Sequence, residues 1–225
     1  MTIPQDKKYK FPWDFINIFI FITSGKMNNH KIPYKHPTKL FIGGLHGDEG
    51  NYTELILEDL TKEKNYKGKV IIIPKLTENS KYVSTLHKEY YKTGEGKYLI
   101  DIIDKYKPNF YFELHSYSDK SYSKLTDPNR ADKIGIPPFI DIGDRVLIAS
   151  ISPVLRNKFT QDDFCMTIEI PKWKVDQSKG RVLEILKMGL DSESRREMIE
   201  RLEEKYPEQV RIARYLSKKY NLILF

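Results

Sequence analysis

The chain has 225 residues, 40% of them hydrophobic and 31% charged, which describes a folded domain of ordinary size and excludes a disordered polypeptide. Its formal charge is +7, and the lysines are spread along the sequence. Without a basic cluster or an aromatic platform, we do not expect a nucleic-acid partner. The one cysteine, Cys165, excludes an internal disulfide framework and fits a reducing, cytoplasmic location.

The first predicted element is the apolar run at residues 15–22, which follows three lysines. The run is short, contains Asn17 and lacks a small-residue cleavage site after it, so a signal peptide is disfavoured. Its aromatic and β-branched residues instead predict a buried strand. No segment approaches the roughly 20 apolar residues that a membrane span needs, so we expect no membrane partner.

Further elements alternate between strands and helices. Strand-like runs lie at 38–43, 69–74, 109–115 and 164–170, and helical stretches lie near 51–63, 96–106 and 180–190. This alternation predicts an α/β fold, with a mixed, mostly parallel sheet flanked by helices. Residues 116–140, rich in proline, serine and aspartate, are predicted to form a long loop that covers a ligand site.

The tail from Asp191 onward differs in character. Ser194 and Glu197 form a capping box before an apolar helical face, and Pro207 opens a second helix at its first turn. We therefore predict an α/β domain over 1–190, followed by a C-terminal helical pair over 191–225 that packs on the same domain. A homodimer contact is the alternative role for these apolar faces.

The segment that carries the chemistry begins where an apolar run ends in Gly43 and Gly44. His46 and Glu49 follow as H-x-x-E, and a helical pattern comes directly after them. A strand that leads through a glycine-rich loop into a helix is where an open α/β sheet builds a ligand site. Glycine lets the backbone turn sharply there. An imidazole and a carboxylate three residues apart on such a loop can converge on one metal ion.

Two later residues complete a metal site. His115 ends one strand-like run and Glu169 lies within another. Two histidines and a glutamate leave one position open on zinc, which is the arrangement of catalytic sites. A second, non-ligating glutamate is what such a metal needs to deprotonate its water. The sequence therefore predicts Zn²⁺ on His46, Glu49 and His115, with Glu169 as the base.

These motifs resemble the zinc carboxypeptidase superfamily, and most of all its succinylglutamate desuccinylase and aspartoacylase branch, in an archaeal-type form. The loop 44–49 matches the G-x-H-G-[DN]-E form of that branch. Residues 115–118, His-Ser-Tyr-Ser, are similar to the carboxypeptidase sequence that begins at the third ligand. The resemblance spans roughly residues 36–175. It implies a zinc-dependent hydrolase of an amide bond in a peptide or an N-acyl amino acid, with Glu169 as the catalytic glutamate.

The sequence departs from this family at the arginines that bind the substrate carboxylate, which the family places between the second and third ligands. No arginine precedes Arg130. A lysine supplies charge without the planar fork that grips a carboxylate, so the grip on a free carboxylate is expected to be weak. Lys92 or Arg130 is the predicted cation, with Arg145 and Arg156 as other arginines that later loops carry. Tyr117 is predicted to line the pocket.

Several alternatives stay open at this point. The missing arginines are compatible with a metal-binding protein of the same fold that has no hydrolytic activity. Glu113, on the same strand face as His115, competes for a ligand or base role. A non-haem iron site also uses two histidines and a carboxylate, but it usually begins with H-x-D on a strand. Cys165 has no nucleophile motif around it and is expected to pack in the core.

Overall fold

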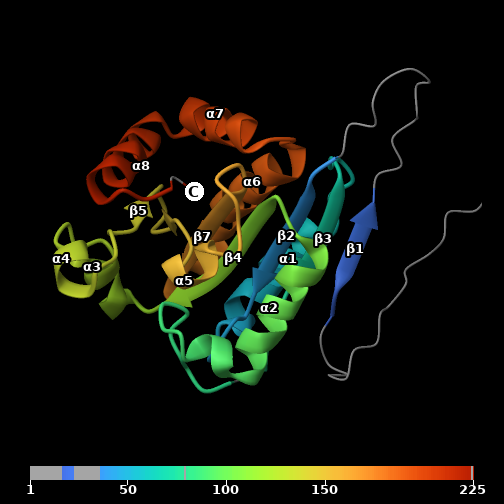
Figure 1. The fold of residues 1–225 in the computed structure, drawn as a ribbon, viewed down its shortest axis with the longest axis horizontal. Coiled ribbons are helices and arrows are strands. Elements are labelled where there is room, and N and C mark those ends of the chain that lie inside the picture. The colour runs from blue at the N-terminus through green and yellow to red at the C-terminus, as the bar shows by residue number, and fades with distance from the viewer. Residues whose placement is uncertain (1–16, 23–35, 79, 224) are drawn as a thin grey trace, which may run out of the picture.

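The computed structural model describes residues 17–22, 36–78, 80–223 and 225 of the chain. Its strands are β1 (Phe19–Ile22), β2 (Thr38–Gly43), β3 (Lys69–Ile73), β4 (Phe110–Tyr117), β5 (Ile140–Asp141), β6 (Leu147–Ala149) and β7 (Phe164–Pro171). They form a seven-stranded sheet in the order β1-β3-β2-β4-β7-β6-β5 (Figure 1). The four central strands are parallel, and the strands at both edges are antiparallel to their neighbours.

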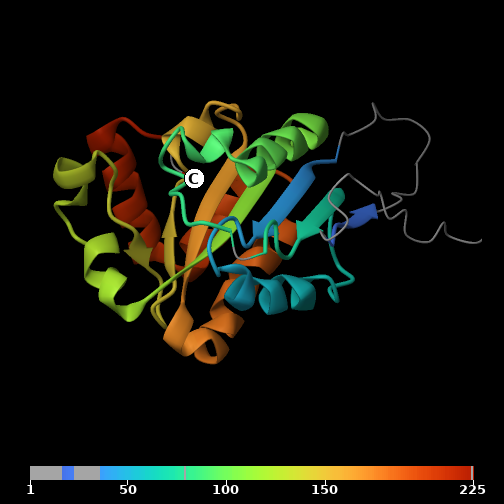
Figure 2. The same cartoon turned by 90° about the horizontal axis from the view of Figure 1, so that it is seen from below.

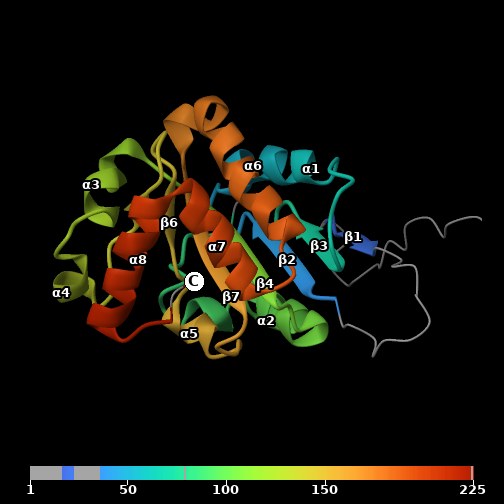
Figure 3. The same ribbon diagram turned by 90° about the horizontal axis from the view of Figure 1, so that it is seen from above.

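Helices cover both faces of this sheet (Figures 2 and 3). They are α1 (Gly50–Leu60), α2 (Gly94–Tyr106), α3 (Tyr122–Leu125), α4 (Arg130–Ile134), α5 (Pro153–Arg156), α6 (Val175–Asp191), α7 (Arg195–Lys205) and α8 (Pro207–Tyr220). Helices α1, α6, α7 and α8 share one apolar core with the sheet. Helices α2 and α5 share the core on the opposite face.

The order of the strands explains where a ligand site can form. The chain runs from β2 through α1 to β3 on one side, and then through α2 past β2 to β4 on the other side. Right-handed crossovers that run in opposite directions place their helices on opposite faces of the sheet. The carboxyl ends of β2 and β4 therefore flank a switch point, where open α/β sheets bind ligands.

Alternate residues of the central strands feed the two cores. Phe41 of β2 stacks on Phe112 of β4 with ring centroids 4.9 Å apart, on the face covered by α1 and α6. Helix α6 lies so close to this face that a Cβ added at Gly189 would be 2.6 Å from the Phe112 ring. Leu40 and Ile42 point to the opposite core. Strands buried on both faces read as continuous apolar runs, which is how this sequence reveals them.

The predicted fold class is confirmed, with differences at several boundaries. Of the predicted buried strand at 15–22, residues 15 and 16 lie outside the described residues, and β1 begins at Phe19. The prediction of burial is wrong for residues 17–21, which are half-buried or exposed because β1 is an edge strand. Helix α6 begins at Val175, not near residue 180. The segment 116–140 is not one continuous loop, since β4 extends to Tyr117 and the short helices α3 and α4 follow.

The C-terminal helical pair is present as α7 and α8. The Ser194 hydroxyl accepts a hydrogen bond from the Glu197 amide at 3.2 Å, and Pro207 occupies the first turn of α8. Both helices contribute buried side chains to the core that contains β7. The domain boundary at residue 190 stays a prediction. None of the helices in the described part of the chain is both long enough and apolar enough to cross a membrane.

Candidate metal centre

Three glycines shape the loop that follows β2. A Cβ at Gly43 would lie 2.5 Å from the Thr53 hydroxyl and 2.8 Å from the Pro74 carbonyl, so no larger residue fits there. Gly44 and Gly47 have φ angles of +60° and +59°, which glycine adopts without a steric penalty. The chain can therefore turn directly from β2 into α1.

This turn brings His46 and Glu49 together. Glu49 is the N-cap residue of α1, but its side chain makes no capping hydrogen bond. Its carboxylate instead points back, with Oε2 3.5 Å from His46 Nδ1 and Oε1 3.4 Å from the Ser116 amide nitrogen, which donates to it. His46 and Glu49 are both buried. The carboxylate is thus used by the site and not by the helix end.

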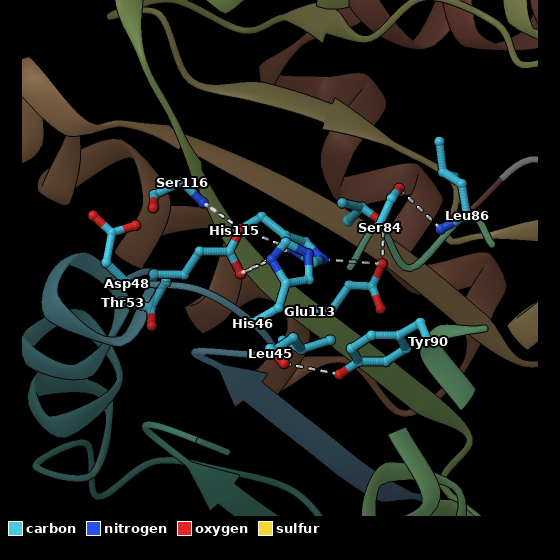
Figure 4. Close-up of polar contacts among 12 residues, drawn as sticks. Leu45, His46, Asp48, Thr53, Ser84, Leu86, Tyr90, Glu113, His115 and Ser116 are labelled. Atoms are coloured by element: carbon cyan, nitrogen blue, oxygen red, sulfur yellow. Dashed lines mark hydrogen bonds and ion pairs between the residues drawn. The ribbon is translucent and has the colours of Figure 1, made fainter. Parts of the chain in front are cut away.

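His115 completes the group from the neighbouring strand β4. Its Nδ1 atom lies 3.1 Å from both Glu49 oxygens. The candidate ligand atoms of His46, Glu49 and His115 all lie within 4.8 Å of one another, and all three residues are buried. Figure 4 shows the two imidazoles side by side beneath the end of β4. The predicted His-Glu-His group is therefore positioned for metal binding.

The chemistry of this group fits a divalent cation. His46 Nδ1 is buried and has no hydrogen-bond partner among the described residues, although it faces the Glu49 carboxylate. Burial lowers the pKa of His46 to about 4, so its ring is neutral at physiological pH and keeps a free lone pair. Two imidazoles and one carboxylate form the donor set that zinc takes in catalytic sites.

His115 sits between two carboxylates. Burial opposes the charged form of its ring, but Glu49 and Glu113 together raise the pKa of His115 well above its ordinary value. Glu49 faces its Nδ1 atom, and Glu113 Oε1 lies 3.5 Å from its Nε2 atom. Without a metal, a protonated His115 would thus be held between the two carboxylates. A cation bound to Nδ1 would take the place of that proton.

Strand register places Glu169 beside the ligands. Strands β4 and β7 are parallel neighbours in which His115 is paired with Glu169. The Glu169 Oε2 atom is buried and has no hydrogen-bond partner among the described residues. Burial, together with the charges of Glu49 and Glu113, raises the pKa of Glu169 to about 7. A carboxylate with a pKa near neutrality is suited to proton transfer.

Glu113, the carboxylate that competes for a ligand or base role, faces the Nε2 atom of His115. The Tyr111 hydroxyl donates to its Oε2 atom at 2.9 Å, and the Thr167 hydroxyl donates to its Oε1 atom at 2.7 Å. Glu113 is not part of the group whose donor atoms converge. The contacts of Tyr111 and Thr167 were not predicted from the sequence, although the alternation of residues along β4 places Tyr111, Glu113 and His115 on one face.

The ligand group opens into a cavity of about 330 Å³. Arg130 lines this cavity, and its Nη1 atom donates to the Pro137 carbonyl at 2.7 Å while the guanidinium lies over the Phe139 ring. Burial lowers the pKa of Arg130, and the charge of Glu169 opposes that shift. An apolar part of the lining is made by Leu125, Ile136, Phe139 and Ile151. The cavity therefore combines a guanidinium, a carboxylate with a raised pKa and an apolar wall.

Of the other predicted substrate-binding residues, one lines the cavity and the rest lie outside it. Tyr117 lines the cavity, and its hydroxyl donates to the Arg145 carbonyl at 2.6 Å. Lys92 does not reach the cavity, because its exposed side chain turns to Glu89 at 3.9 Å on the surface. The guanidinium groups of Arg145 and Arg156 also lie outside it, against the Tyr122 ring and the Asp163 carbonyl respectively.

Two further residues at the cavity, Tyr82 and Lys172, were also not predicted. The Tyr82 ring packs edge-on against His46 with centroids 4.6 Å apart and remains largely exposed. Lys172, which directly follows β7, forms an ion pair with Asp48 and joins the ligand loop to the strand that carries Glu169. Neither has a sequence signature, since each depends on which segments the fold brings together. Cys165 is buried in the core, as expected.

Comparisons with known proteins place the chain as follows. A family model described as "Uncharacterized protein conserved in archaea (DUF2119)" matches residues 34–222. The protein MJ0501 of Methanocaldococcus jannaschii is 59% identical over 190 residues, which cover 83% of this chain and 93% of that protein.

Solved structures give weaker matches. An aspartoacylase family protein from Mesorhizobium loti is 13% identical with a TM-score of 0.36, covering 67% of this chain and 57% of that one. A metallo-carboxypeptidase from Pseudomonas aeruginosa is 10% identical with a TM-score of 0.42, covering 75% and 58%. The chain spans less than two thirds of the length of either structure. Assigning a chemistry therefore depends on the residues of the site.

Proposed function

This chain belongs to the archaeal protein family DUF2119, and we propose that it is a zinc-dependent hydrolase of an amide bond in a peptide or an N-acyl amino acid. The observation that carries the proposal is the convergence of His46, Glu49 and His115 at a cavity that also contains Glu169 and Arg130. A ligand group of this kind leaves one zinc position open, as catalytic sites require and structural sites do not.

The residues around the ligands supply the acid–base chemistry. Zinc bound there would polarise the scissile carbonyl and lower the pKa of a water molecule toward neutrality. Glu169 has a buried oxygen without a hydrogen-bond partner in the described part of the chain, and its pKa is raised to about 7. It is suited to accept the proton of the attacking water and to return it to the leaving nitrogen. Such proton transfer contributes roughly 10²–10⁴ in rate.

Arg130 is the proposed anchor for an anionic group of the substrate. One of its terminal nitrogens is held by the Pro137 carbonyl, and the guanidinium faces the same cavity as Glu169. A guanidinium held in place presents a planar fork to a carboxylate. The missing earlier arginines predicted weak binding of a free carboxylate. This proposal replaces that prediction, because Arg130 of α4 reaches the cavity.

The size of the cavity limits the part of the substrate that enters. A volume of about 330 Å³ is at the lower end of ordinary small-molecule sites. The apolar wall formed by Leu125, Ile136 and Phe139 suits a short hydrocarbon part. We therefore propose an acyl group or a single residue next to the scissile amide as the portion that is bound.

Metal analysis followed by a substrate screen tests this proposal. The protein is stripped with a chelator, loaded with one equivalent of Zn²⁺, and incubated with N-acyl amino acids and short peptides, each with a free and an amidated carboxyl end. We expect release of amine from some of these compounds by the zinc-loaded form and none by the stripped form.

Protein that is loaded with zinc without prior exposure to the chelator is the matched control, because it separates metal dependence from damage by the chelator. Stoichiometric zinc binding without hydrolysis of any compound would instead support a metal-binding protein without hydrolytic activity. Failure of the natural protein to bind zinc at all would contradict the metal site itself.

A further inference from the structure

We infer that Glu113 is a positioning residue that fixes the orientation and the tautomer of His115, so that the Nδ1 lone pair of the imidazole is turned toward the metal position. The inference rests on the metal site of the proposed function, but it does not depend on hydrolysis. It gives a role to a buried carboxylate that is neither a ligand nor the base in the proposed chemistry.

Both oxygens of Glu113 are held by hydroxyl groups. Tyr111 lies two residues earlier on the same face of β4 and donates to Oε2 at 2.9 Å. Thr167 of β7 is paired with Glu113 in the parallel register and donates to Oε1 at 2.7 Å. Glu113 is 1% exposed. With both oxygens tied in this way, the carboxylate has one fixed orientation.

That orientation assigns the two nitrogens of His115. Nε2 lies 3.5 Å from Glu113 Oε1, while Nδ1 lies 3.1 Å from both oxygens of Glu49. A neutral imidazole carries one N–H and one lone pair. Each nitrogen faces a carboxylate, and a cation shared by Nδ1 and Glu49 would leave the N–H at Nε2, where the Glu113 carboxylate can accept it. Ligating histidines are commonly oriented by a carboxylate in this manner.

The same contacts argue against the other roles for Glu113. Its Oε1 and Oε2 atoms already accept hydrogen bonds, whereas Glu169 has a buried oxygen without a partner among the described residues. Figure 4 shows Glu113 on the Nε2 side of His115, beside Ser84 and away from Ser116. Ser116 contacts Glu49, so Glu113 lies on the side opposite the ligand carboxylate.

Metal affinity measures this role directly. Zn²⁺ affinity is determined for the stripped protein by competition with a chromophoric chelator. Glu113→Gln is expected to weaken binding 10- to 100-fold, as the loss of such an orienting partner does elsewhere. Tyr111→Phe and Thr167→Val each remove one of the two hydroxyl donors and are expected to weaken binding less. Thr167→Ser, which keeps the hydroxyl, should restore the natural affinity.

Tyr91→Phe is the matched control. It removes a tyrosine hydroxyl that donates to the Thr85 carbonyl at 2.9 Å and forms no hydrogen bond with Glu113. Thermal unfolding of the metal-free proteins shows whether a variant is folded. If Glu113→Gln does not fold, the two hydroxyl variants still decide the question.

The ring nitrogens of His115 give a second readout that a merely structural role would not change. In the zinc-loaded natural protein, ¹⁵N chemical shifts are expected to show a proton on Nε2 and the metal on Nδ1. Natural zinc affinity in all of the Glu113, Tyr111 and Thr167 variants, or zinc on Nε2, would overturn the inference and leave the proposed hydrolase standing. Weakened binding in a protein that hydrolyses nothing would support the inference while the proposed hydrolase failed.

Discussion

The two ends of the parallel strands differ in how far their buried polar groups are hydrogen-bonded. At the amino-terminal end, the fully buried Lys39 donates to the Leu190 carbonyl at the end of α6 and lies over the Phe110 ring, 5.3 Å from its centroid. Close by, Asp163 accepts hydrogen bonds from Asn109 and from the Thr160 amide and hydroxyl. The polar groups here satisfy one another.

At the carboxyl-terminal end, polar atoms are left without partners. His46 Nδ1, Ser116 Oγ and Glu169 Oε2 are buried and neither accept nor donate a hydrogen bond among the described residues. At the opposite end Arg156 also has an unpartnered Nε, but its other nitrogens donate to the carbonyls of Thr160 and Asp163. Since buried polar groups are normally paired, the concentration of unpaired atoms marks the end of the sheet that a ligand completes.

The largest expected effect breaks the ligand group. His46→Ala or His115→Ala leaves two protein ligands, which rarely retain a catalytic ion. After dialysis, bound zinc should fall from one equivalent per chain in the natural protein to a small fraction of that in either variant, as measured by elemental analysis. His87→Ala, at an exposed histidine outside the cavity, is the control. Full zinc occupancy in the double variant His46→Ala/His115→Ala would refute the site.

The next effect separates the base from the ligands. Glu169→Gln keeps the size of the side chain but removes its ability to accept a proton, so the zinc content should be unchanged while kcat falls by roughly 10²–10⁴. Glu54→Gln alters a carboxylate that pairs with Lys75 outside the cavity, and it should leave kcat unchanged. Loss of zinc in Glu169→Gln would make Glu169 a ligand and not the base.

A smaller effect concerns the substrate anchor. Arg130→Ala should lower kcat/KM about 10- to 100-fold for a substrate with a free carboxylate, the effect of losing a hydrogen bond to a charged group. The amidated counterpart should change little. Arg130→Lys should recover only part of the loss, because lysine lacks the planar fork. Lys92→Ala is the control, and an equal loss on both substrates would show that Arg130 is structural.

The smallest effect tests the amino-terminal end. Burial lowers the pKa of Lys39 to about 7, against about 10.4 in an unfolded chain. Between these values the unfolded state binds the proton that the folded state has lost, so this residue makes the free energy of unfolding rise with pH. Lys39→Met removes this titration. The free energy of unfolding of the natural chain should therefore rise relative to that of Lys39→Met by up to about 1.4 kcal/mol per pH unit above pH 7.

Urea unfolding at pH 7, 8 and 9 measures this slope. Lys62→Met is the control, because the hydrogen bond to Asp59 raises the pKa of the exposed Lys62 and places its titration above this range. A difference between the Lys39 variant and the natural chain that stays constant with pH would mean that the buried amine keeps its proton.

Much of the fold was predictable because its signals are local. The apolar runs of β2, β3, β4 and β7 are continuous in the sequence, as expected of strands buried on both faces. Strands β5 and β6 were missed because two or three residues are too few to show a period. The start of α6 was placed too late because Asp176, Gln177, Ser178 and Gly180 give its first turns a polar, loop-like appearance.

The residues of the site likewise divide into those with a local sequence signal and those without one. His46 and Glu49 belong to one loop with its own glycine signature, so the sequence exposes them. The environment of Glu113 depends on the register between β4 and β7, which pairs it with Thr167 across 54 residues of chain. The positions of Arg130 and Lys92 depend on how the segments around the cavity fold back on it. Sequence patterns carry neither kind of information.

A metal ion at this site would join two strands, because its two histidine ligands come from different strands. His46 follows β2 and His115 lies near the carboxyl end of β4, so neighbouring strands carry ligands that are far apart along the chain. An ion held by both acts as a reversible cross-link that closes a long loop, which disfavours the unfolded chain. By mass action, free metal at 100 times its dissociation constant would add about 2.7 kcal/mol to the stability of the fold. Metal supply would then set how long the protein survives, apart from any reaction it performs.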